Sequence, residues 1–359
     1  LRAAGHHVTG SDVAFHPPMG DALARWGVET RRGYDPANLE PAPDLVVVGN
    51  VCRPDHVEAR AAIDRGLRYA SLPATLAEIF LAHREPIVVA GTHGKTTTTS
   101  LLAYLLDRAG LDPGLLVGGV ARDFESARIG HTGGPFVVEG DEYDSAFFEK
   151  TPKLWQYRAR AAVLTSIEHD HVDIYPDAAS YERAFETFVA GLPVDGLLVA
   201  FAGDPAVRRI ASSARCRVVW YALSGDDTGA IDPTWSAAPM AVTGGATPFE
   251  LFAGGSVAGR LLSPLAGHHN LRNTLACFAL VAERYGIAPA TLAGALRAFR
   301  GVKRRQELIG VAGGVLVYDD FAHHPTAVRE TIRALRSRHS RVIAAFEPRS
   351  ATASRRLHQ

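Results

Sequence analysis

The sequence predicts an α/β protein with doubly wound parallel sheets, divided into three domains. Short apolar runs that read as buried strands, such as 87–90 and 161–165, alternate with longer segments of helical periodicity. A glycine-containing loop joins one of these strands directly to a helix near residue 91. With 359 residues, the chain is long enough for two or three domains.

The composition is that of a globular protein with no general affinity for polyanions. Hydrophobic residues make up 47% of the chain and charged residues 21%, and 38 basic residues balance 38 acidic ones. This balance predicts no nucleic-acid or membrane partner, and the longest apolar runs are too short to span a bilayer. Three scattered cysteines, Cys52, Cys216 and Cys277, indicate a reducing compartment rather than a disulfide framework.

Residues 1–83 form the first predicted domain, in which strands and helices alternate. Asp12, at the end of the first strand, suits either a contact with ribose hydroxyls or a surface turn. The predicted elements are a strand, a helix, a buried parallel strand and a helix that begins with proline, at 8–12, 20–26, 45–50 and 54–65.

Residues 84–300 form the second predicted domain, which follows a break at 81–86. Residues 225–262 are rich in Gly, Thr and Pro and predict a small antiparallel β insertion, whereas 270–285 predict a helix. Strands are predicted at 87–90, 115–117, 136–139, 161–165, 197–201 and 218–221.

Residues 301–359 form the third predicted domain, with a strand at 315–319, a helix at 325–338 and a strand at 342–346. A unit of this size cannot bury a core of its own. The first residues of the chain also read as the end of a helix. We therefore expect the sequence to be truncated at both ends relative to the natural protein.

The strand at 87–90, the following loop and the next helix have the build of a phosphate-binding loop. Gly91 and Gly94 allow a tight turn that brings backbone N–H groups to phosphate oxygens at the positive end of the helix dipole. Lys95 can reach the terminal phosphates of a nucleotide, and the Thr96 hydroxyl can bind Mg²⁺. A glycine-rich turn with an incidental lysine is the alternative.

Two other predicted strands end in polar clusters, at the sheet edge where ligands bind in open α/β folds. Residues 139–144 supply several carboxylates, which either hold Mg²⁺ or form a solvated acidic loop. Residues 165–173 include His169 and His171, whose spacing suits zinc, although the neighbouring carboxylates also suit harder cations. The residue types alone leave the metal open.

The loop at 91–97, Gly-Thr-His-Gly-Lys-Thr-Thr, resembles the nucleotide loop of the Mur ligases, the ATP-dependent amide-forming enzymes of peptidoglycan metabolism. The resemblance covers essentially the whole chain. It implies a Rossmann-like UDP-binding domain, a central P-loop ATPase domain and an incomplete Rossmann-like ligase domain. Further segments resemble elements of the family in the same order, at 139–144, 170–171, 267–273, 301–305 and 319–326.

The resemblance also implies which residues bind ATP and Mg²⁺. Lys95, His171 and Arg304 would be catalytic, and Arg304 ranks ahead of Arg305 as the arginine that meets the ATP phosphates. Thr96, Glu139 and His171 would hold Mg²⁺. His269 or Asn270 could instead cap the predicted helix. The residues implied in ATP binding are Gly91, Thr92, His93, Gly94, Lys95, Thr96, Thr97, His269, Asn270, Asn273, Arg304 and Asp320.

Within the family, His93 resembles the branch that acts directly on UDP-N-acetylmuramate. Segments 141–148, 149–160 and 346–350 resemble the member that adds the murein tripeptide L-alanyl-γ-D-glutamyl-meso-diaminopimelate. The member that adds L-alanine is the runner-up, and a P-loop ATPase or kinase without ligase activity is the alternative from another class. The resemblance implies a cytoplasmic bacterial enzyme that forms an acyl phosphate, and no protein partner is evident.

Overall fold

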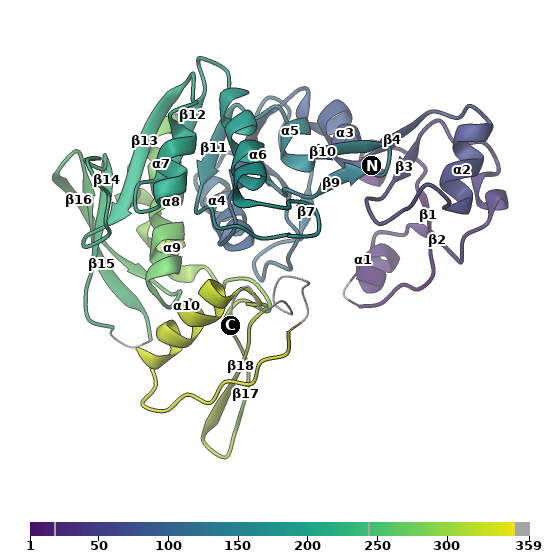
Figure 1. Ribbon diagram of the computed structural model, residues 1–359. Helices are drawn as coiled ribbons and strands as arrows, with labels where there is room; N and C mark the ends of the chain where they lie inside the picture. Colours follow the sequence, from purple (N-terminus) through teal and green to yellow (C-terminus); the bar gives the residue numbers. More distant parts are fainter. Residues whose placement is uncertain (18, 243–244, 349–359) are drawn as a thin grey trace. The chain divides into compact units, whose positions relative to one another are not determined.

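The computed structural model describes residues 1–17, 19–242 and 245–348 (Figure 1). The chain divides into two compact units. The first unit comprises Leu1–Leu76 with Asp144–Thr151, and the second comprises Ala77–Tyr143 with Pro152–Gln359. In the described residues of both units, no helix combines the length and the apolar composition needed to cross a bilayer.

The first unit is built from short two-stranded sheets. Strand β1 pairs in parallel with β2, and β3 pairs in parallel with β4, as expected of a doubly wound pattern. Strands β9 and β10 form a further two-stranded sheet. The elements are β1 Thr9–Asp12, α1 Met19–Arg25, β2 Glu29–Arg32, β3 Val46–Val48, α2 Val57–Asp64, β4 Tyr69–Ser71, α3 Leu72–Leu76, β9 Asp144–Ala146 and β10 Glu149–Pro152, with 3-10 turns at Arg2–Ala4 and Pro36–Leu39.

Two predictions for the first unit need correction. The strand predicted as buried at 45–50 is only partly buried, with Val47 39% exposed, because β3 belongs to a two-stranded sheet. The helix predicted to begin at residue 54 begins at Val57, because the His56 imidazole caps it by accepting a hydrogen bond from the backbone N–H of Ala59 at 3.4 Å.

A ten-stranded sheet organises the second unit, in the order β16-β15-β14-β13-β12-β11-β5-β8-β6-β7. The strands from β14 to β6 in this order are parallel, which confirms the predicted α/β class. The antiparallel strands predicted at 225–262 are present, but they extend the main sheet because β14 pairs with β13. The strands are β5 Glu85–Ala90, β6 Gly114–Leu116, β7 Ala127–Arg128, β8 Pro135–Glu139, β11 Ala161–Leu164, β12 Leu197–Phe201, β13 Arg217–Leu223, β14 Trp235–Pro239, β15 Thr247–Ala253 and β16 Ser256–Ser263.

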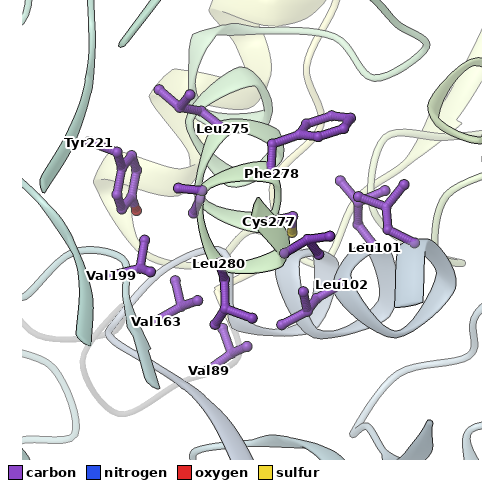
Figure 2. Packing of buried hydrophobic residues seen from close by; sticks show 14 of the residues in the cluster. Val89, Leu101, Leu102, Val163, Val199, Tyr221, Leu275, Cys277, Phe278 and Leu280 are labelled. Atoms are coloured by element: carbon purple, nitrogen blue, oxygen red, sulfur yellow. The ribbon is translucent and has the colours of Figure 1, made fainter. Parts of the chain in front are cut away.

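Helices cover both faces of this sheet. Alternate strand residues such as Val89 and Val163 pack with α4 and α8 in one core cluster, as Figure 2 shows. Val88 and Leu198 are equally buried but lie outside that cluster, on the opposite face, where α7 packs against β12. The helices are α4 Lys95–Arg108, α5 Lys153–Gln156, α6 Ala178–Ala190, α7 Pro205–Ala211, α8 His268–Tyr285 and α9 Ala293–Ala298, with a π turn at Ala77–Leu81 and a 3-10 turn at Pro289–Leu292.

The last part of the second unit is a hairpin of β17 (Glu307–Ala312) and β18 (Val315–Asp319), followed by α10 (Pro325–Arg336). Helix α10 packs against α8, which is one of the helices that cover the main sheet. The prediction of a strand at 342–346 is wrong. No partner strand pairs with it among the described residues, and Ile343 is 82% exposed. Residues 349–350 of the segment singled out at 346–350 lie outside the described residues.

Candidate active site

The loop between β5 and α4 requires glycine at two positions. The φ angle is +129° at Gly91 and +82° at Gly94. A Cβ at Gly91 would lie 2.2 Å from the Thr165 hydroxyl, and a Cβ at Gly94 would lie 2.6 Å from Oδ1 of Asn273. No side chain caps the start of α4. The loop therefore approaches its neighbours closely and leaves the helix N-terminus available to an anion.

Lys95 is held at this loop by Glu142. Its Nζ donates hydrogen bonds to both Glu142 carboxylate oxygens, at 3.1 and 2.9 Å, and to the Gly91 carbonyl at 2.7 Å. Burial alone would raise the pKa of Glu142, but the Lys95 ammonium and the His171 imidazole outweigh it and lower that pKa to about 2. Burial would lower the pKa of Lys95, yet Glu142 raises it. Both groups are therefore charged at neutral pH.

The same carboxylate positions His171. Nε2 of His171 lies 3.1 Å from Oε1 of Glu142, and the Tyr181 hydroxyl donates to that oxygen at 3.0 Å. The Tyr175 hydroxyl donates to the Glu142 backbone carbonyl at 2.7 Å. Glu142 is fully buried. Its carboxylate and its backbone carbonyl contact the phosphate-loop lysine, the histidine and two tyrosines, and these groups form one polar cluster.

Thr96 and Glu139 bring oxygen atoms together at the start of α4. The Thr96 hydroxyl donates to Oε1 of Glu139 at 2.8 Å, and Oε2 of Glu139 accepts from the backbone N–H of Gly118 at 2.9 Å. Hydroxyl and carboxylate oxygens fit Mg²⁺. The Thr96 and Glu139 oxygens therefore form a donor pair that suits this cation, whereas Nε2 of His171 faces Glu142.

A cavity of about 300 Å³ adjoins the loop. It lies at the start of α8, beside the segment 305–306 and the first turns of α10. That volume is at the lower end of the range for ligand pockets. The predicted ATP-binding residues that line it are His93, Gly94, Thr96, Thr97, His269, Asn270, Asn273 and Asp320, whereas Gly91, Thr92, Lys95 and Arg304 do not, and neither do the metal candidates Glu139 and His171.

The polar side chains at the start of α8 are not helix caps. Gly267 occupies the N-cap position, and no side chain bonds there. The Asn270 amide donates to the Ala266 carbonyl at 2.8 Å, and the Asn273 amide donates to Oδ1 of Asn270 at 3.3 Å. Burial lowers the pKa of His269 to about 4, so its imidazole is neutral at pH 7. These side chains therefore offer neutral hydrogen-bonding groups to the cavity.

Arg305, rather than Arg304, is the arginine at the cavity. Nη2 of Arg305 lies 3.2 Å from the Thr96 hydroxyl oxygen. Nε of Arg304 instead lies 3.4 Å from Oδ2 of Asp319, and the Arg304 side chain is half-exposed. Asp320 is also fixed nearby, because its Oδ2 accepts from the backbone N–H of Gln306 at 2.8 Å. Of the two arginines, it is therefore Arg305, ranked second from the sequence, that lines the cavity.

Three profiles of one family match the sequence and together cover most of it. They are described as "Mur ligase family, catalytic domain" at residues 1–84, "Mur ligase middle domain" at 89–281 and "Mur ligase, glutamate ligase domain" at 304–358. The chain belongs to the Mur ligase family.

The proteins similar to this chain are named after two different amine substrates. UDP-N-acetylmuramate–L-alanyl-gamma-D-glutamyl-meso-2,6-diaminoheptandioate ligase from Escherichia coli is 39% identical over 98% of this Mur ligase and 75% of its own length. UDP-N-acetylmuramate–L-alanine ligase from a Roseiflexus species is 39% identical over 93% of this chain and 71% of its own. A crystal structure of the tripeptide-named ligase from Neisseria meningitides superposes with a TM-score of 0.76 at 37% identity, covering 84% of this chain and 93% of that one.

Sequence reasoning identified the phosphate loop of this Mur ligase but assigned no role to two acidic residues beside it. Glu142 holds Lys95 and His171, and Glu168 accepts hydrogen bonds from His93 at 2.9 Å and from Thr326 at 2.9 Å. Both glutamates occur in the polar segments that follow strands, which is the one signal the sequence gives for them. Their partners come from segments that are distant in the sequence.

Proposed function

We propose that this Mur ligase joins UDP-N-acetylmuramate to L-alanyl-γ-D-glutamyl-meso-diaminopimelate, with conversion of ATP to ADP and phosphate. The observation that carries the ATP-dependent part is the cavity that adjoins the phosphate loop and is lined by His269, Asn270, Asn273 and Asp320. Neutral amides and an imidazole suit a nucleoside, while the loop suits its phosphates.

The reaction joins two anions, so the protein must neutralise charge. An oxygen of the muramate carboxylate attacks the γ-phosphorus of ATP, the bond to the β-phosphate oxygen breaks, and an acyl phosphate and ADP form. Lys95, released from Glu142, and Arg305 stabilise the negative charge on the transferred group. Mg²⁺ supplies further charge neutralisation when bound, and Thr96, Glu139 and His171 are the residues that would hold it.

The amine of the tripeptide then attacks the acyl carbon as the free base. A C–N bond forms, phosphate leaves with one oxygen of the original carboxylate, and the amine loses a proton. Water must be kept from the acyl phosphate during this step. We assign residues 1–83 to the sugar nucleotide, 84–300 to ATP and 301–359 to the amine-containing substrate, in the cytoplasm of a bacterium.

The choice of tripeptide rests on the names of the relatives and on two segments. The Escherichia coli and Neisseria proteins carry the tripeptide in their names at 39% and 37% identity. The segments at 141–160 and 346–350 resemble the tripeptide-adding member. Part of the first of these segments, 144–152, contains the β9–β10 sheet.

A second candidate is the addition of L-alanine, because a Roseiflexus ligase of that name is also 39% identical to this chain. The two functions are separated by measuring product formation from UDP-N-acetylmuramate and ATP with either amine substrate in the full-length protein. We expect kcat/KM for the tripeptide to exceed that for L-alanine by at least about 10⁴-fold, the range of sites built to bond one substrate's polar groups. Comparable values would assign the protein to the second function.

A further inference from the structure

Three side chains from separate segments converge beside the cavity. They are His93 in the phosphate loop, Glu168 after β11 and His324, the residue that precedes α10. Their potential ligand atoms all lie within 4.8 Å of one another. Nε2 of His93 is 2.9 Å from Oε2 of Glu168, and Nδ1 of His324 is 3.6 Å from the same oxygen. None of the three is among the residues proposed above to hold Mg²⁺.

The spacing and the donor atoms fit a transition metal better than magnesium. Zinc binds imidazole nitrogen and carboxylate oxygen at about 2.0–2.2 Å, so the ligand atoms of a tetrahedral site lie about 3.3 Å apart. The distances from Oε2 of Glu168 to the two imidazole nitrogens, 2.9 and 3.6 Å, lie on either side of that value, and all the ligand atoms lie within 4.8 Å of one another. Two imidazoles and one carboxylate suit zinc, cobalt or nickel, whereas Mg²⁺ prefers a shell of oxygens.

Hydrogen bonds outside the three ligands hold Glu168 in place. Its second carboxylate oxygen, Oε1, accepts from the Thr326 hydroxyl at 2.9 Å, and its backbone N–H donates to the Thr92 hydroxyl at 2.9 Å. These two hydrogen bonds come from groups outside the cluster and orient the carboxylate before any cation binds.

We propose that His93, Glu168 and His324 bind a zinc-like dication at a site separate from that for Mg²⁺. The bound ion would fasten the segment before α10 to the phosphate loop. Three protein ligands leave one coordination position open, and His93 and Glu168 both line the cavity. We also expect zinc to slow turnover, because the ion would link two parts that must move between substrate binding and product release. This last consequence rests on the proposed function, whereas binding does not.

Metal titration of the chelator-treated full-length protein tests the site. Cobalt binding is followed by visible absorption, and zinc binding by competition with a chromophoric chelator, with Mg²⁺ in excess and without ATP. We expect one tight site in the wild type, weakened at least about tenfold by His93→Gln or His324→Gln. His323→Gln is the matched control, because Nδ1 of this neighbouring imidazole lies 3.0 Å from the Phe321 carbonyl and outside the cluster. It should leave the affinity unchanged.

Thermal unfolding provides a second readout that does not depend on catalysis. Zinc at about 100 times the wild-type Kd should raise the Tm of the wild type more than that of the His324→Gln protein, whose metal-free circular dichroism reports whether it is folded. The proposal is overturned if wild type binds zinc no more tightly than the His93→Gln/His324→Gln double variant. It is also overturned if His323→Gln weakens binding as much as His324→Gln does. Since no substrate is present, failure of the proposed ligase reaction would not alter these results.

Discussion

Replacing Glu142 with glutamine should destabilise the second unit strongly, because it removes the counter-charge of a buried lysine. Glu142 is fully buried, and its pKa is lowered from an ordinary value of 4.5 to about 2. At about 1.4 kcal/mol per pKa unit, this lowering corresponds to about 3.5 kcal/mol at neutral pH. Breaking a buried ion pair by removing one partner costs a similar amount, about 3–5 kcal/mol. For a unit of this size the Tm should fall by roughly 6 °C.

The pH dependence of this effect has a definite sign. A carboxyl group whose folded-state pKa is lowered contributes stability above its unfolded pKa, and that contribution disappears as the pH falls through the folded value. The difference in unfolding free energy between wild type and Glu142→Gln should therefore be constant near pH 7. This difference in unfolding free energy should become smaller as the pH falls from about 4.5 toward 2.

Urea unfolding at several pH values, with Glu250→Gln as the control, measures this difference. Oε1 of Glu250 lies 2.9 Å from Nε of Arg260, whose side chain is 77% exposed. Breaking such a surface pair should cost less than about 1 kcal/mol. A loss in Glu142→Gln no larger than in Glu250→Gln would refute the reasoning, and so would a difference that stays constant down to pH 3.

Five further variants test the assignments at the phosphate loop. Lys95→Ala should lower kcat at least about 10²-fold at a temperature where circular dichroism shows the variant to be folded, although losing the partner of Glu142 should also lower its Tm. Retention of more than a tenth of the wild-type rate would remove Lys95 from the mechanism. Glu139→Gln should raise the Mg²⁺ concentration needed for half-maximal rate, because an amide is a poorer ligand for a hard cation than a carboxylate. His171→Ala should raise it less. Unchanged Mg²⁺ titrations for both variants would place the metal elsewhere. Arg305→Ala should lower kcat by about 10³-fold or more and Arg304→Ala by less than about tenfold, since of the two arginines only Arg305 reaches Thr96. The reverse order of effects in steady-state assays would make Arg304 the arginine that stabilises the phosphates.

Local signals in the sequence were sufficient for the elements that carry the phosphate loop. The apolar strand β5, the glycines at 91 and 94 and the helix after them are neighbours in the chain, so their spacing alone predicts the turn. The α/β class and the parallel order of the central strands follow from the same alternation of strand and helix. Those predictions are confirmed by the ten-stranded sheet.

The features that sequence reasoning missed depend on contacts between distant segments. In the sequence, Glu142 cannot be distinguished from the other acidic residues of its loop. Its contacts with Lys95, His171 and Tyr181 form only in the folded protein. The choice between Arg304 and Arg305 depends on backbone direction, since adjacent residues point to different sides and Arg304 has a φ of +58°. The segment 342–346 has the composition of a strand, but a strand also needs a neighbour with which to form hydrogen bonds.

The central claim is that the muramate carboxylate is activated by the γ-phosphate of ATP at this loop. Supplying UDP-N-acetylmuramate with ¹⁸O in the carboxylate, together with ATP and the tripeptide, tests it by mass spectrometry of the released phosphate. An acyl phosphate transfers one carboxylate oxygen to phosphate, so we predict that each phosphate released with amide formation carries one ¹⁸O. Amide formation with no ¹⁸O in the phosphate would contradict the account.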